Sequence, residues 1–122
     1  MEYLTKFSNT MSLEERKHQS QMIREKYKDR LPVIVDRVKT TDPEIDKHKF
    51  LTPQNLTLGE FTFIIRKRFT KKVSAYEGLY FFHAKDKILL AHGELLENLF
   101  SQHVDEDGFL RILYTLEATF GA

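Results

Sequence analysis

The 122-residue sequence contains no cysteine and no tryptophan, and it has only three prolines and five glycines. Without cysteine there is no disulfide framework, no thiol nucleophile and no cysteine-ligated zinc site, which fits a reducing compartment. A G-x-S-x-G elbow, a P-loop and a G-x-G-x-x-G fingerprint are missing as well. We therefore expect a protein that is not an enzyme and that needs no cofactor.

Long hydrophobic runs are also missing. No apolar stretch approaches the roughly 18 residues that a membrane-spanning helix needs. The first ten residues carry a lone Lys6 and no apolar segment, so they do not resemble a signal peptide. These absences predict a protein of the cytosol or nucleus, whose membrane contact would have to come through a surface or an added lipid.

The residues that are present predict one domain with its own core. Hydrophobic residues make up 41% of the chain and include ten Phe. Net charge is +1, but residues 1–72 hold 16 Lys and Arg against 10 Asp and Glu, whereas residues 73–122 hold 3 against 8. This asymmetry favours a basic face for acidic partners, although ordinary exposed helices would give the same count. We expect no nucleic-acid partner, because the basic run 66–68 lacks neighbouring stacking aromatics.

Two capping boxes mark helix starts. Ser12 with Glu15 opens a helix over residues 13–28, whose thin apolar stripe predicts a surface position. Thr57 with Glu60 opens a second helix, which ends in the cations 66–68. Leucines and a phenylalanine at helical spacing predict a third helix over residues 94–103, with Leu95, Leu96, Leu99 and Phe100 buried.

Four segments are expected to be strands. The β-branched run 33–35 follows Pro32, and the short segment 49–52 is closed by Pro53, which is typical of an edge strand. Residues 79–83 and 109–116 complete the set, with an apolar run at 88–90 between them. The predicted elements follow one another in the order helix, strand, strand, helix, strand, helix, strand. This order predicts an α+β fold, a ubiquitin-like β-grasp with a mixed four-stranded sheet, a crossover helix and an extra N-terminal helix.

The segment 49–52 is the first candidate binding feature. Alternation places Lys49 and Leu51 on one side of the strand, and Phe50 and Thr52 on the other. An exposed edge can accept a partner peptide as an added strand. The alternative is that Phe50 and Leu51 are ordinary core residues.

Metal sites are not indicated by spacing. None of the five histidines lies three or four residues from another, so no helical metal site is expected; they are His18, His48, His83, His92 and His103. The acidic run 105–107 lacks the spacing of a calcium loop and is expected to form a solvated turn.

Several motifs in order resemble the ubiquitin-like autophagy modifiers, a family that includes the GABA type A receptor-associated protein and the light chain three of microtubule-associated proteins. The motifs are IREKY, DRLPVIV, DKHKFLTP, the Leu-Thr-x-Gly-x-Phe turn into IIRKR, DEDGFL and the terminal Phe-Gly. The resemblance spans residues 13–121 and is densest over 23–68. It implies a β-grasp with two N-terminal helices. It divides the chain into an N-terminal extension (1–11), a helical segment (12–30), the β-grasp (31–120) and a processing site (121–122).

The resemblance also implies a conjugation reaction. A cysteine protease would remove Ala122, and activating and conjugating enzymes would carry the Gly121 carboxylate as a thioester and transfer it to phosphatidylethanolamine. The protein would then move from the cytoplasm to the autophagosome membrane. A glycine has no Cβ to block a narrow channel, and lipid chains would supply the membrane anchor. Two alternatives remain: an ordinary frayed terminus, and a β-grasp adaptor that binds peptides without being conjugated.

The resemblance further implies a groove for cargo receptors that carry an aromatic-x-x-aliphatic motif. Pocket one, for the aromatic residue, would consist of Ile23, Pro32, Lys49, Leu51 and Phe109. Pocket two, for the aliphatic residue, would consist of Phe50, Thr52, Pro53, Leu56, Phe61, Ile64 and Arg68. Arg30 and Lys47, together with Lys49 and Arg68, would contact acidic residues that flank the motif.

The chain departs from the family pattern at several positions. Thr52 replaces Val or Ile, Lys28 replaces Pro, and Leu13 replaces an aromatic residue. Residues 84–87 stand where the family has an Asn pair, which bears on contacts with the conjugation enzymes. Residues 1–10 exceed the usual start, and three roles stay open for them: a mobile segment, a cover of the groove, or a membrane contact.

Overall fold

The computed structural model describes residues 1–117. Its helices and strands follow one another in the order α1 (Glu2–Thr10), α2 (Leu13–Lys26), β1 (Arg30–Arg37), β2 (Lys49–Pro53), α3 (Leu58–Arg66), β3 (Tyr80–His83), α4 (Leu96–His103) and β4 (Leu110–Thr115). The seven elements predicted from residue patterns are all present, and α1 is the additional one. No helix in this part of the chain is long and apolar enough to cross a membrane.

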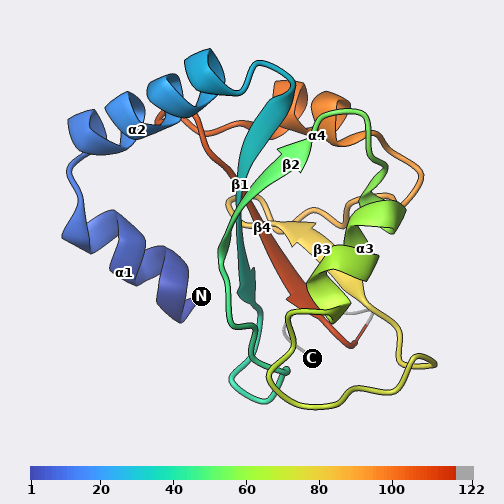
Figure 1. Cartoon of the computed structure of the whole chain (residues 1–122). Helices are drawn as coiled ribbons and strands as arrows, with labels where there is room; N and C mark the ends of the chain where they lie inside the picture. The colour runs from blue at the N-terminus through green and yellow to red at the C-terminus, as the bar shows by residue number, and fades with distance from the viewer. Residues whose placement is uncertain (118–122) are drawn as a thin grey trace.

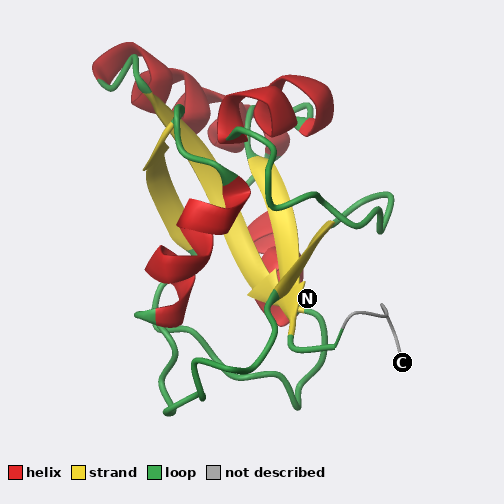
Figure 2. Ribbon diagram, turned by 90° about the vertical axis from the view of Figure 1, so that its right-hand side faces the viewer, coloured by secondary structure: helices red, strands yellow, loops and turns green. Residues whose placement is uncertain are grey.

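The four strands form one mixed sheet in the order β2-β1-β4-β3. The central pair β1 and β4 is parallel, and both outer pairs are antiparallel. Helix α3 covers one face of the sheet, while α1 and α2 lie on the other (Figures 1 and 2). The mixed four-stranded sheet with its crossover helix is the predicted β-grasp arrangement.

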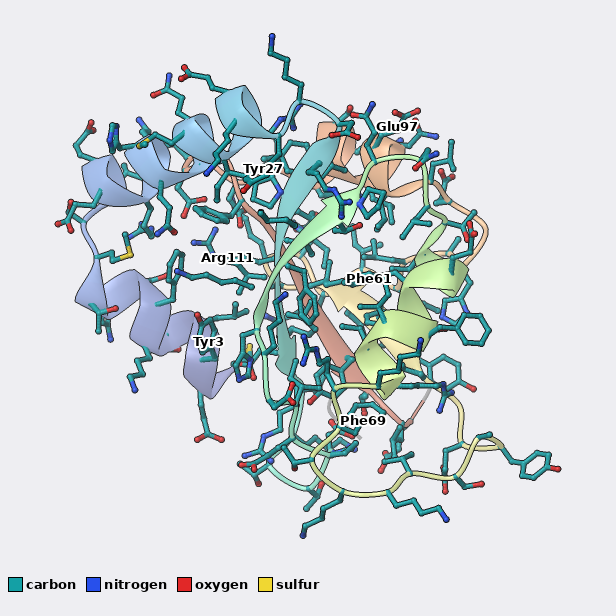
Figure 3. All side chains as sticks on the ribbon, viewed as in Figure 1. Tyr3, Tyr27, Phe61, Phe69, Glu97 and Arg111 are labelled. Atoms are coloured by element: carbon teal, nitrogen blue, oxygen red, sulfur yellow. The ribbon has the colours of Figure 1, made fainter. Side chains whose placement is uncertain are left out.

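Each face of the sheet has its own apolar cluster. The cluster under α3 is the larger, and Leu58, Phe61 and Ile65 of that helix are fully buried in it. The second cluster lies under α1 and joins Leu4 and Phe7 to sheet residues; its other buried members are Ile34, Phe109 and Leu113. Figure 3 shows Phe61 on the α3 side and Arg111 on the α1–α2 side.

Several predicted boundaries were wrong by one to three residues. Helix α2 ends at Lys26, because Tyr27 leaves the helical conformation as its C-cap. Helix α4 begins at Leu96, with Leu95 in the extended N-cap position. Leu95 and Phe100, which were predicted to be buried, are only half-buried. Strand β1 extends beyond the β-branched run because its polar ends pair with β2 and β4.

Helix α1 is held to the sheet by a buried carboxylate. Asp36 of β1 is 2% exposed, and its Oδ2 accepts hydrogen bonds from the backbone N–H of Tyr3 at 2.8 Å and of Leu4 at 3.3 Å. These are donors of the first helical turn, which have no partner inside the helix. Tyr3 also stacks on His48, with ring centroids 4.1 Å apart. The residues before Ser12 therefore form an ordered helix.

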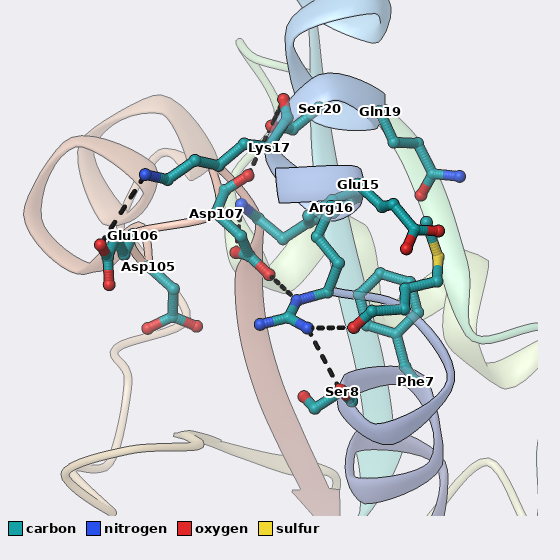
Figure 4. A network of polar contacts seen from close by, with 12 residues as sticks. Phe7, Ser8, Glu15, Arg16, Lys17, Gln19, Ser20, Asp105, Glu106 and Asp107 are labelled. Carbon is teal, nitrogen blue, oxygen red and sulfur yellow. Dashed lines mark hydrogen bonds and ion pairs between the residues drawn. The ribbon is translucent and has the colours of Figure 1, made fainter. Parts of the chain in front are cut away.

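Helix α2 is held by polar contacts, as its thin apolar stripe predicted. Arg16 Nε donates to Asp107 Oδ2 at 2.9 Å, and Ser20 Oγ donates to the Asp107 carbonyl at 2.5 Å (Figure 4). Asp107 is 3% exposed and also pairs with Arg111 of β4. The prediction of a solvated turn at 105–107 is thus wrong for Asp107, because two arginines satisfy its charge inside the protein.

Candidate functional site

Strand β2 is an edge of the sheet, as predicted. It pairs with β1 on one side only, in a register that sets Pro32 opposite Leu51 and Ile34 opposite Lys49. Proline has no N–H, so Pro32 and Leu51 form a non-hydrogen-bonded pair of the antiparallel ladder. The main-chain groups of Leu51, and by alternation those of Lys49, therefore face the open edge, where they can pair with an added strand.

The two sides of β2 face different helices. Lys49 is half-buried and Leu51 is 38% exposed, whereas Phe50 and Thr52 are 4% and 2% exposed. The predicted alternation is therefore confirmed. Of the two residues considered as core, Phe50 is core and Leu51 is not.

Two of the residues predicted for pocket one are linked to α2: Ile23 belongs to it and Lys49 contacts it. Ile23 packs with buried Phe109 in the α1-side cluster. Lys49 Nζ contacts Gln19 Oε1 at 3.3 Å and lies 4.2 Å from the ring centroid of Phe7. Partial burial lowers the pKa of the Lys49 ammonium. An acidic partner group at this position would act against that lowering, because an opposite charge favours the charged form.

Phe7 of α1 contacts two of the residues predicted for pocket one, Lys49 and Phe109. Its ring meets Phe109 edge to face, with centroids 5.4 Å apart. Sequence reasoning missed this residue, although Tyr3, Leu4, Phe7 and Met11 recur at helical spacing. That recurrence was the available signal, and it indicates that α1 supports the predicted aromatic pocket.

The residues predicted for pocket two divide into a buried floor and a partly exposed rim. Phe50 meets fully buried Phe61 edge to face, with centroids 5.5 Å apart, so both belong to the core. The rim residues are half-buried: Pro53, Leu56, Ile64 and Arg68. A ligand side chain would therefore contact the rim residues first. To enter more deeply, it would have to displace the rings of Phe50 and Phe61.

Cationic side chains surround β2. Arg30 Nη1 donates to the Leu51 carbonyl at 3.1 Å, Lys47 Nζ lies 5.2 Å from the Phe50 ring centroid, and Arg68 pairs with Asp46 at 3.6 Å. Exposed pairs of this kind contribute little to stability and can exchange partners readily. The edge is thus suited to a peptide with acidic residues. The processing residues Gly121 and Ala122 lie outside the described residues.

Comparison with known proteins agrees with this architecture. A family profile described as "Autophagy protein Atg8 ubiquitin like" matches residues 15–121. Autophagy-related protein 8 of Mycosarcoma maydis is 43% identical over 116 residues, which is 94% of this chain and 95% of the relative. Autophagy-related protein 8e of Arabidopsis thaliana is 44% identical over 117 residues, which is 95% of this chain and 93% of the relative.

Solved structures agree as well. The crystal structure of Trypanosoma brucei ATG8 superposes with a TM-score of 0.80 at 33% identity, over 95% of this chain and 97% of that one. Plasmodium falciparum Atg8, solved in complex with a Plasmodium falciparum Atg3 peptide, has a TM-score of 0.76 at 32% identity, over 91% and 95%. The chain belongs to the Atg8 family of ubiquitin-like autophagy proteins.

Proposed function

We propose that this protein is a lipid-conjugated modifier that recruits motif-bearing partners to autophagosomal membranes through the β2 edge. It is a substrate of enzymes and not itself an enzyme. A cysteine protease removes Ala122, and activating and conjugating enzymes transfer the Gly121 carboxylate to phosphatidylethanolamine. The cytoplasmic chain thereby becomes a membrane protein, anchored by two acyl chains at about 0.8 kcal/mol per buried methylene.

The geometry of β2 supports this proposal most directly. Side chains alternate along a strand, so residues one and four of a bound peptide point to opposite faces of the sheet. The residues proposed for pocket one lie on the α2 side of β2, and those proposed for pocket two lie on the α3 side. An aromatic-x-x-aliphatic motif added beside β2 would therefore send one anchor to each pocket.

Partners of two kinds follow from this geometry. Cargo receptors would bind by the motif, with acidic flanks meeting Arg30, Lys47, Lys49 and Arg68. The Plasmodium relative was solved with an Atg3 peptide, which supports peptide binding by conjugation-pathway proteins in this chain too. Two anchors and a few main-chain hydrogen bonds predict micromolar affinity, about −8 kcal/mol.

Calorimetry with a motif peptide tests the groove. Leu51→Ala should weaken peptide binding about tenfold or more and leave the fold intact, because Leu51 is 38% exposed beside the open edge. Leu89→Ala is the matched control, since Leu89 is 53% exposed beyond β3. Unchanged affinity in Leu51→Ala would contradict the groove assignment.

The intact mass of the chain from membrane and soluble fractions of its own cells tests conjugation. Membrane-bound chain that lacks Ala122 and carries one phosphatidylethanolamine is the expected result. The alternative is an adaptor that binds peptides and is never conjugated. Gly121→Ala separates the two, because it should abolish membrane recruitment of a modifier and leave an adaptor unaffected.

A further inference from the structure

Three potential metal ligands converge at the edge of the sheet opposite β2. His83 ends β3, Asp86 lies in the turn that follows, and His103 ends α4. One ligand atom from each of the three lies within 4.8 Å of the other two. The His83 and His103 ring centroids are 4.7 Å apart. The tertiary fold brings these residues together, which is why sequence spacing predicted no site.

The hydrogen bonds of His83 orient its ring as in a metal site. His83 is 3% exposed, and its Nε2 lies 3.1 Å from the His103 carbonyl oxygen, to which it can only donate. A ligating histidine commonly donates its other N–H to a backbone carbonyl, which fixes the tautomer. The remaining nitrogen, Nδ1, points at Asp86 Oδ1, 2.6 Å away.

Both ring nitrogens of His83 thus face oxygen acceptors. A cation held between His83 Nδ1 and Asp86 Oδ1 would have a ring nitrogen on one side and a carboxylate oxygen on the other. Imidazole nitrogens and carboxylate oxygens are both common ligands of divalent metal ions.

The charges around the cluster favour a cation as well. A hollow of about 350 Å³ opens beside the histidines, and the charged side chains that line it are three carboxylates and one lysine: Asp86, Asp105, Glu106 and Lys85. Asp105 is paired with Arg111 at 2.8 Å, and Glu106 lies 3.8 Å from Lys17 Nζ. Asp86 is therefore the carboxylate that faces the histidines directly. Solvent reaches the site, because the Asp86 side chain is 41% exposed.

We propose that His83, Asp86 and His103 bind one Zn²⁺ ion. Two imidazoles and a carboxylate are a common zinc ligand set, and water would fill the fourth position. A tetrahedral centre with bonds of about 2.0–2.1 Å sets its ligands roughly 3.3 Å apart. Asp86 and His103 would make the adjustment, since they lie in a turn and at a helix end.

The ion would tie the end of β3 to the end of α4, on the edge remote from the peptide-binding strand. Zinc binding and motif binding can therefore be measured independently. Failure of one proposal leaves the other intact.

Calorimetric titration of Zn²⁺ into the full, untagged chain tests the site. Binding should saturate at one ion per chain, and Co²⁺ should give the intense visible absorption of a tetrahedral centre. His103→Gln and Asp86→Asn should each weaken Zn²⁺ binding at least about 100-fold. Both side chains are partly exposed, so these variants should fold even if His83→Gln does not.

His92→Gln is the matched control, because His92 is exposed and lies outside the cluster. It should bind Zn²⁺ like the unaltered chain. Unsaturable binding, octahedral Co²⁺ spectra, or equal affinity in His103→Gln would each overturn the proposal. Loss of binding in His92→Gln would overturn it too, because the ion would then lie elsewhere.

Discussion

Helices α3 and α2 lie on opposite faces of the sheet and are held to it in different ways. Helix α3 packs through apolar side chains, with Leu58, Phe61 and Ile65 fully buried. Helix α2 buries only Ser20 and is held by Arg16 and a buried aspartate. Apolar burial is insensitive to pH and tolerates small shifts, whereas a buried ion pair depends on protonation and on geometry. The packing of α3 should therefore supply most of the stability. The attachment of α2 should be the more sensitive of the two to a change in pH.

The largest expected effect is on the α3 face. Phe61→Ala removes a fully buried ring that contacts Phe50, and the cavity should lower the free energy of unfolding by about 4 kcal/mol. Urea denaturation measures this loss. Phe63→Ala on the same helix should change stability by less than about 0.5 kcal/mol, because Phe63 is 67% exposed. Similar losses in both variants would contradict the apolar account.

The next effect is on the α2 face. Asp107→Ala leaves Arg16 and Arg111 without their shared partner, which should lower the free energy of unfolding by about 3 kcal/mol. Glu106→Ala is the control, since its side chain is 75% exposed and its pair with Lys17 spans 3.8 Å. A stable Asp107→Ala variant with unchanged α2 amide exchange would show that the polar network does not hold this helix.

Lowering the pH should weaken the attachment of α2 in the unaltered chain, because it protonates Asp107. Burial raises the pKa of the Asp107 carboxyl, but hydrogen bonds and charge from Arg111, with donors from Phe109 and Arg16, hold it below its ordinary value. The stabilisation from Asp107 is therefore present above the unfolded pKa, about 3.9, and is lost as the pH falls through the lower folded pKa.

Unfolding free energy measured across this range should fall more steeply in the unaltered chain than in Asp107→Ala. The Glu60 carboxyl of the α3 capping box also has a lowered pKa, because of its hydrogen bonds with Thr57. Glu60 is present in both chains, so the comparison isolates Asp107. Parallel pH profiles would count against its role.

The smallest effect concerns α1. Asp36→Ala removes the acceptor of two first-turn N–H groups and should cost about 1 kcal/mol. Hydrogen exchange should speed up for α1 amides and stay unchanged in α3. Asp29→Ala, at an exposed position, should leave both helices alone. Faster exchange of the amides in both α1 and α3 would mean that α1 does not open separately from the rest of the protein.

Local chemistry made much of the fold predictable. The capping boxes at Ser12 and Thr57 are both present in the structure, and each marks a helix start. Side-chain alternation assigned the two faces of β2 correctly. What could not be predicted depends on residues distant in sequence. Phe7 packs against Phe109, Asp107 pairs with two arginines, and His103 approaches His83 only after folding.

The position of Pro32 opposite Leu51 predicts a distinctive pattern of amide exchange along β2. Because proline cannot donate a hydrogen bond across to Leu51, the amides of Lys49 and Leu51 point to solvent, while those of Phe50 and Thr52 face β1. Solvent exchange along this one strand should therefore alternate, fast and slow, in the free protein. A partner that adds a strand would slow exchange at the amides of Lys49 and Leu51 selectively. These two amides would therefore show whether a peptide is bound at the β2 edge, with no substitution in the chain.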